Sequence, residues 1–145
     1  MARVSIYFNF MGDTEEAFGF YADVFGTEVT SMMRMGDLPP GPDGPELPED
    51  EKSKVMNAQL PILAGTVLMG TDMLESMGHE RRIGNNVTIN LEPDSLAETQ
   101  RLFDRLSEGA TDVTALMPMF WGSHWGTCLD RYGVRWMFNS PAETD

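Results

Sequence analysis

Residues 117–141 read MPMFWGSHWGTCLDRYGVRWMFNSP and contain all three tryptophans of the chain. The segment from Asp130 to Gly133 predicts a tight turn, because an aspartate can bond its own backbone and glycine adopts a positive backbone angle at little cost. We therefore expect a hairpin with strands at 125–129 and 134–138. Side chains alternate along a strand, which places Val134, Trp136 and Phe138 on one face and Arg135, Met137 and Asn139 on the other. Both faces are largely apolar, so we expect both to be covered.

Outward from this hairpin, the chain shows one order of elements twice. One helix is predicted to begin after Asp13 and another after Ser95. Asp13 with Glu16, and Ser95 with Glu98, have the spacing of a capping box. Glycines follow both helices and can end them. Alternating apolar residues predict the remaining strands at 4–10, 28–35, 55–62 and 66–71 in the first half, and at 85–91 and 111–117 before the hairpin.

The repeated order predicts an α+β fold made of two βαβββ modules. The modules span residues 1–72 and 85–141 of a single domain, with a connector at 73–84. We expect their sheets to pair into one curved, half-closed mixed barrel with the helices outside and a concave cavity within. An acidic insertion at 36–54 contains five prolines, which oppose regular strands, and we expect it to be mobile rather than an ordered lid.

Composition and charge exclude several classes of protein. The formal net charge is −13, which argues against binding to nucleic acid, whose phosphates need a surplus of Lys and Arg. The sequence contains no apolar segment of the length that a bilayer requires, and the first residues do not have the pattern of a secretion signal. The single cysteine, Cys128, cannot pair within the chain, which suits the cytoplasm, and a buried free thiol is favoured over a catalytic nucleophile.

Four segments resemble a known superfamily. The first is YFNFMGDTEEAFGFYADVF at 7–25, followed by Gly26, and it is similar to the opening module of the vicinal oxygen chelate superfamily, which includes glyoxalase I, bleomycin-resistance proteins and extradiol dioxygenases. The others are LMGTD at 68–72, MPMFWG at 117–122 and DRYGVRWMFNSP at 130–141. They resemble its PhnB-like branch, which also carries the label 3-demethylubiquinone-9 3-methyltransferase. The chain has no glycine-rich turn between a strand and a helix, of the kind that nucleotide-like cofactors need.

The resemblance implies where a metal would bind. Metal-using members of the superfamily hold a divalent ion with His, Gln or Glu side chains from the first, fourth, fifth and eighth strands. Alignment on the two helix starts and on the Gly133 turn places at those positions Ile6, Met69, Asn86 and Met137, with Tyr7 in place of Ile6 if the first strand is shifted by one residue. This set contains no carboxylate and no imidazole, which divalent cations prefer. We therefore expect no metal site and no cofactor.

Without a metal, we expect the concave face to bind a flat or apolar small molecule. Its predicted lining comprises Ile6, Phe8, Phe10, Gln59, Met69, Asn86, Trp121, Trp125 and Met137. Aromatic faces stack on flat ligands, methionines adapt to their shape, and amides fix their orientation. The alternative is that these side chains simply fill the barrel, as large apolar residues commonly do.

Two classes of function stay open. The first is a metal-free small-molecule-binding protein, and the second is a lyase, transferase or resistance-type enzyme with a relocated active site. His124 is the candidate catalytic residue for the second, although a structural role is favoured, and His79 is expected at the surface. The resemblance also implies a homodimer.

Overall fold

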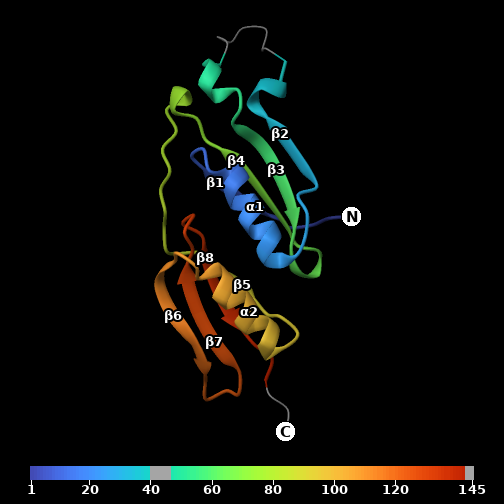
Figure 1. Ribbon diagram of the computed structural model, residues 1–145, viewed down its shortest axis with the longest axis vertical. Coiled ribbons are helices and arrows are strands. Elements are labelled where there is room, and N and C mark those ends of the chain that lie inside the picture. The colour runs from blue at the N-terminus through green and yellow to red at the C-terminus, as the bar shows by residue number, and fades with distance from the viewer. Residues whose placement is uncertain (40–46, 143–145) are drawn as a thin grey trace. The chain divides into compact units, whose positions relative to one another are not determined.

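A computed structural model describes residues 1–39 and 47–142 of this chain. The chain forms two compact units, Met1–Arg82 (unit 1) and Ile83–Asp145 (unit 2), and each contains one four-stranded mixed sheet and one α-helix (Figure 1). The predicted α+β fold of two βαβββ modules is confirmed. Each sheet is open at both edges, and neither closes into a barrel within the described ranges.

Unit 1 contains the elements β1 (Ile6–Phe10), α1 (Thr14–Phe25), β2 (Ser31–Arg34), β3 (Val55–Pro61) and β4 (Val67–Asp72). Its strands lie in the order β1-β4-β3-β2. The β1 strand pairs with β4 in parallel, whereas the other neighbours are antiparallel. The second strand begins three residues later than its predicted start at residue 28.

The helix α1 packs on one face of this sheet. Phe18, Tyr21 and Val24 are fully buried there, and their spacing of three residues puts them on one face of the helix. The sheet makes room for Phe18 at Gly70, where a Cβ atom would lie 2.6 Å from the Phe18 ring. The close approach of helix and strand therefore depends on a glycine in β4.

The capping box predicted at Asp13 and Glu16 is wrong. Asp13 precedes α1, but its side chain makes no capping hydrogen bond to the helix. Instead, the buried carboxylate of Asp72 accepts hydrogen bonds from Gly12 N (2.9 Å), Thr14 N (3.1 Å) and Thr14 Oγ1 (2.7 Å) through Oδ1, and from Val55 N (2.8 Å) through Oδ2. A residue from the end of β4 thus supplies the negative charge that a helix N-terminus favours.

Unit 2 contains the elements β5 (Ile89–Leu91), α2 (Leu96–Leu106), β6 (Thr111–Pro118), β7 (His124–Leu129) and β8 (Arg135–Asn139). Its strands lie in the order β5-β8-β7-β6, with β5 parallel to β8. The predicted hairpin is confirmed as β7 and β8. Gly133 has a φ of 87°, and Asp130 Oδ1 accepts from Tyr132 N and Val134 N within the turn.

The helix α2 begins as the sequence predicts, since the Ser95 hydroxyl accepts a hydrogen bond from Glu98 N at 3.1 Å. It covers Trp136 and Phe138 of β8, which are fully buried. The Phe103 ring meets Phe138 edge to face, with 5.2 Å between centroids. The Trp136 indole donates to Asp130 Oδ2 at 2.8 Å, which satisfies its nitrogen inside the core.

The stem of the acidic insertion is part of the fold. Met35 N bonds Lys54 O and Gly36 N bonds Lys52 O, each at 2.8 Å, which extends the β2–β3 pairing. The carboxylate of Glu51, 5% exposed, accepts from the backbone and hydroxyl of Ser76. The predicted mobility covers the whole insertion at 36–54, of which residues 40–46 lie outside the described residues.

Helix length also bears on the predicted absence of a membrane span. The two α-helices contain 12 and 11 residues. No helix within residues 1–39 and 47–142 is long and apolar enough to cross a bilayer.

Candidate functional site

Each sheet has one face against its helix and an opposite face, which we call the open face. In unit 1 the strand register decides which residues share it, because residues paired across neighbouring strands point the same way. Met69 pairs with Tyr7 on β1 and with Gln59 on β3, and all three alternate with residues buried under α1. The same alternation adds Asn9, Thr71 and Asn57 to this face.

The first strand faces the other way from the sequence prediction. Ile6, Phe8 and Phe10 pair with Leu68, Gly70 and Asp72, so they lie on the helix side of the sheet. The Phe8 ring stands 6.1 Å from that of Tyr21 on α1, and Phe10 is 2% exposed. Phe10 is buried and Ile6 and Phe8 are half-buried, and all three lie on the helix side instead of the open face. The position that faces outward is Tyr7, the alternative that a shift of one residue provides.

The open face of unit 2 has an apolar centre and a polar margin. Met137 lies between Asn90 on β5 and Thr127 on β7, and Trp125 pairs with Asn139 farther along. The amide of Asn139 donates to Asn90 Oδ1 at 2.7 Å, which links β8 to β5 across this face. Arg135 and Leu129 form the next pair, toward the Asp130–Gly133 turn.

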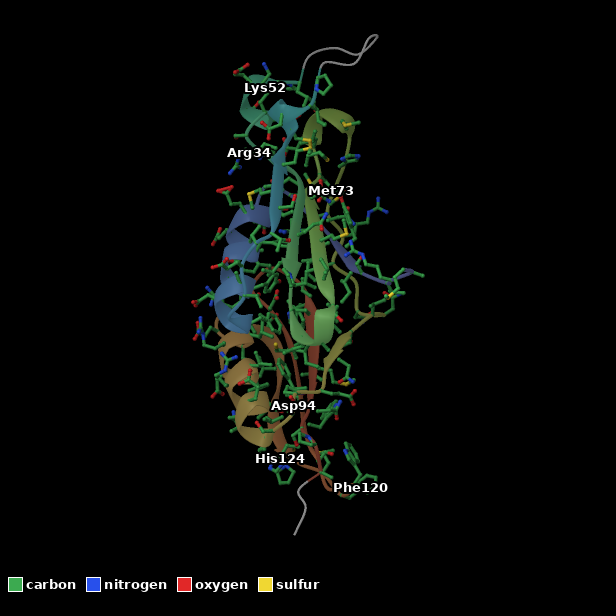
Figure 2. The ribbon with its side chains drawn as sticks, turned by 90° about the vertical axis from the view of Figure 1, so that its right-hand side faces the viewer. Arg34, Lys52, Met73, Asp94, Phe120 and His124 are labelled. Atoms are coloured by element: carbon green, nitrogen blue, oxygen red, sulfur yellow. The ribbon has the colours of Figure 1, made fainter. Side chains whose placement is uncertain are left out.

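Three other predicted site residues lie elsewhere. Asn86 precedes β5 and is exposed, whereas Trp121 lies in the β6–β7 connection, 48% exposed and edge to face with Phe120 at 4.9 Å. His124 alternates with Trp125 and so shares the helix side of β7 with buried Cys128. Figure 2 shows the His124 ring on the side of α2 and Phe120 on the opposite side. His124 therefore lies on the helix side of β7 and not on the open face, and its catalytic role stays a prediction.

The donor atoms at the outward positions do not fit a divalent cation. The parallel strand pairs place Tyr7 beside Met69 in unit 1 and Asn90 beside Met137 in unit 2. Two thioethers, a phenol and an amide offer neither the carboxylates nor the imidazoles that zinc, magnesium or calcium prefer. Nowhere in the described ranges do three or more His, Cys, Asp or Glu residues gather in a way that could hold a metal ion.

The remaining candidates for acid, base or nucleophilic chemistry are engaged in the fold. Asp72, Asp130 and Glu51 are buried and accept hydrogen bonds from neighbouring backbone amides. Cys128 is a buried free thiol, as the sequence predicts, and burial raises its pKa to about 11, so the reactive thiolate is disfavoured at neutral pH. His79 is exposed, as predicted, and its Nδ1 accepts from Leu74 N at 3.1 Å.

Sequence reasoning missed most of the polar open-face residues. Four predicted residues do lie on an open face, namely Gln59, Met69, Trp125 and Met137. The residues that went unnoticed include Asn90, Thr127, Arg135 and Asn139. A signal for two of them was present, because the alternation along residues 134–139 already puts Arg135 and Asn139 on the same face as Met137.

Comparisons with known proteins find a family and relatives for this sequence. The family described as 3-demethylubiquinone-9 3-methyltransferase matches residues 2–138. YjdN from Escherichia coli is 24% identical over 94% of this chain and 93% of its own length. The uncharacterized protein Rv0887c from Mycobacterium tuberculosis is 30% identical over 89% of this chain and 69% of its own length.

Solved structures extend the comparison to the fold. Protein PA1353 from Pseudomonas aeruginosa is 33% identical with a TM-score of 0.80, covering 99% of this chain and 100% of its own. The PhnB protein from Bacillus cereus is 20% identical with a TM-score of 0.75, covering 97% of this chain and 100% of its own. Because the family match spans nearly the whole sequence, this chain belongs to the PhnB-like, 3-demethylubiquinone-9 3-methyltransferase family, whose fold is that of glyoxalase and bleomycin-resistance proteins.

Proposed function

We propose that this protein binds a small molecule on its open faces without the help of a metal ion. The observation that carries the proposal is the set of outward side chains at the paired positions, Tyr7 with Met69 and Asn90 with Met137. This set can make apolar contacts and hydrogen bonds, but it contains no carboxylate, imidazole or amine. Binding is the function that such a surface supports best.

The composition of the faces indicates what kind of molecule would bind. Met69 and Met137 are half-buried at the middle of their sheets, and thioethers pack well against aromatic rings. Tyr7 and Trp125 add flat surfaces that can stack on a ring. The amides of Gln59, Asn90 and Asn139 supply the few hydrogen bonds that fix orientation in ligand sites. A flat, mainly apolar molecule with one or two polar groups suits this lining.

Two structures of the same fold bear on the choice between binding and catalysis. TnmS3 from Streptomyces, an antibiotic-binding protein, is 21% identical with a TM-score of 0.56. FosX from Listeria monocytogenes, a fosfomycin resistance protein, is 14% identical with a TM-score of 0.61. Both likenesses are in fold alone, so they support the capacity of this architecture for small-molecule recognition and leave the ligand of this chain open.

The methyl transfer in the family description has no support in the residues of this chain. Anionic groups of cofactors often bind at free helix N-termini. In unit 1 the carboxylate of Asp72 already bonds the amides that precede and begin α1, and in unit 2 the hydroxyl of Ser95 caps α2. Neither terminus offers a glycine-rich cradle.

Pairing of two copies stays a prediction of the resemblance, and analytical ultracentrifugation of the protein alone tests it.

A thermal-shift screen tests the proposed function. We expect aromatic small molecules to raise the melting temperature through binding to the folded state, whereas zinc, magnesium or a chelator shifts it by less than about 1 °C. The binding of each hit should be lost in Met137→Glu, which puts a charge at the centre of an open face. Binding should survive in Gln100→Glu, which adds the same negative charge on the exposed surface of α2. A large stabilisation by a divalent ion that a chelator reverses would refute the proposal.

A further inference from the structure

We propose that the open face of unit 2 selects molecules that carry an acidic group, and that Arg135 is the residue that binds this group. The inference deepens the proposed function and rests on it, because it names the chemical class of the ligand. The class is a flat, apolar molecule with one negative charge, such as an aromatic acid.

Arg135 is placed on the open face by the strand register and held there by two contacts. It pairs with Leu129 on β7 and lies two residues from Met137, so its side chain leaves the sheet on the same side. Its Nε donates to Gly84 O at 3.1 Å, and its Nη2 donates to Asp112 Oδ2 at 3.3 Å. The Nη1 atom makes no hydrogen bond to the residues that the structure describes. A guanidinium fixed at one edge presents its remaining N–H groups to an incoming carboxylate with little loss of freedom.

Asp112 is a counter-ion that a ligand can replace. Its side chain is 64% exposed whereas that of Arg135 is 24% exposed, and exposed ion pairs of this kind contribute little. Asp112 also has a φ of 49°, in the left-handed region, where β6 shifts register against β7 between Thr111 and Thr114. Its carboxylate therefore reaches Arg135 from an irregular edge strand and not from a packed network.

The neighbours of Arg135 favour an amphipathic acid over a bare anion. Met137 and Trp125 offer apolar surface farther along the same face, and the bonded amides of Asn90 and Asn139 lie beside them. The net charge of the whole chain is −13, so an acid is attracted only where a cation acts locally. In unit 1 the corresponding face carries Tyr7, Asn9, Asn57, Gln59, Met69 and Thr71, and none of these is Asp, Glu, Lys, Arg or His. We therefore place the acid-binding position in unit 2.

Two fluorescent dyes with the same aromatic skeleton test the inference. Anilinonaphthalene sulfonate carries a negative charge, and phenylnaphthylamine lacks it. We expect Arg135→Gln to weaken binding of the sulfonate about tenfold, the order expected for one charge-assisted contact, and to leave the neutral dye within about twofold. Arg101→Gln removes an equal charge from the exposed surface of α2, where Arg101 pairs with Glu98, and should affect neither dye by more than about twofold.

Asp112→Asn provides a test that does not depend on losing a contact. Asparagine tolerates the left-handed backbone of this position, so the fold is preserved, while the competing charge is removed. We expect the sulfonate to bind about threefold more tightly and the neutral dye to bind as before. The inference alone is overturned if the wild-type protein binds the neutral dye but Arg135→Gln and Asp112→Asn leave the sulfonate unchanged, or if each variant changes both dyes equally. If the wild-type protein binds neither dye, the proposed function is refuted as well.

Discussion

In both units a helix packs on one face of a four-stranded sheet, but the strand beneath the helix carries a glycine in unit 1 and a phenylalanine in unit 2. In unit 1 the strand β4 presents Gly70, opposite Phe8, and the helix fills the space with Phe18. In unit 2 the equivalent strand β8 presents Phe138, opposite Leu91, and Phe103 of the helix packs against its edge. The two units therefore fill the space between helix and sheet with different residues at corresponding positions, although the order of their elements is the same.

The two units also place a buried carboxylate at different points. Asp72 ends β4 and ties the start of α1 to β3 through four hydrogen bonds. Asp130 begins the β7–β8 turn and accepts hydrogen bonds from Tyr132 N and Val134 N within the turn and from the Trp136 indole. A single buried side chain thus stabilises a long-range junction in unit 1 and a local hairpin in unit 2.

Removing these carboxylates gives the largest expected effects. We expect Asp72→Ala to lower the free energy of unfolding by about 4 kcal/mol and Asp130→Ala by about 3 kcal/mol, because each leaves buried donors unpaired. Far-UV circular dichroism during urea denaturation measures both. Tryptophan fluorescence adds a separate reading of unit 2, which holds all three tryptophans. Asp94→Ala, at an exposed position, should change stability by less than about 0.5 kcal/mol, and equal effects from all three variants would contradict the assignment.

Gly70→Ala tests whether Phe18 of α1 needs a glycine beneath it in β4. A Cβ atom at this position would lie 2.6 Å and 2.9 Å from two atoms of the Phe18 ring, which is fully buried. We expect a loss of about 2 kcal/mol in the free energy of unfolding, part of which the double variant with Phe18→Leu should recover. Gly19→Ala is the matched control, because nothing lies within 4 Å of its Cβ position and alanine favours a helix, so a gain of about 1 kcal/mol is expected. A neutral Gly70→Ala would show that this interface is loosely packed.

The two helix starts should respond differently to loss of the preceding side chain. Ser95→Ala removes a direct cap of α2 and should cost about 1 kcal/mol in thermal or chemical denaturation. Asp13→Ala removes a partly exposed ion pair with Arg81 and a bond to Met11 N, but the cap of α1 from Asp72 stays. We expect it to cost about 0.5 kcal/mol. A larger cost for Asp13→Ala than for Ser95→Ala would reverse the comparison.

The sequence predicts correctly the features that depend on neighbouring residues. The order of strands and helices, the turn from Asp130 to Gly133 and the cap at Ser95 each follow from residues within a few positions of one another. The cap of α1 does not, because Asp72 lies 58 residues beyond Thr14 and only the pairing of β1 with β4 brings them together. No local pattern distinguishes this cap from the one that Asp13 was expected to provide.

The open faces were predicted less well because side-chain direction has a period of two. A shift of one residue turns every side chain of a strand to the opposite face, so the predicted β1 residues Ile6, Phe8 and Phe10 all lie on the helix side of the sheet. The alternation separates Ile6, Phe8 and Phe10 from Tyr7 and Asn9, but it does not say which of the two sets faces the helix. On β5 the outward residue is Asn90 and not Asn86, because the strand begins only at Ile89.

The hydrogen-bonded stem of the β2–β3 insertion provides a site for inserting foreign sequence. Backbone hydrogen bonds join Met35 to Lys54 and Gly36 to Lys52, and the Glu51 carboxylate accepts from Ser76 N. These bonds hold the end of β2 beside the start of β3. Each doubling in the length of a flexible loop costs only about 0.6 kcal/mol. We therefore expect the sheet of unit 1 to tolerate an affinity tag or a biosensor peptide inserted between the two strands of this stem.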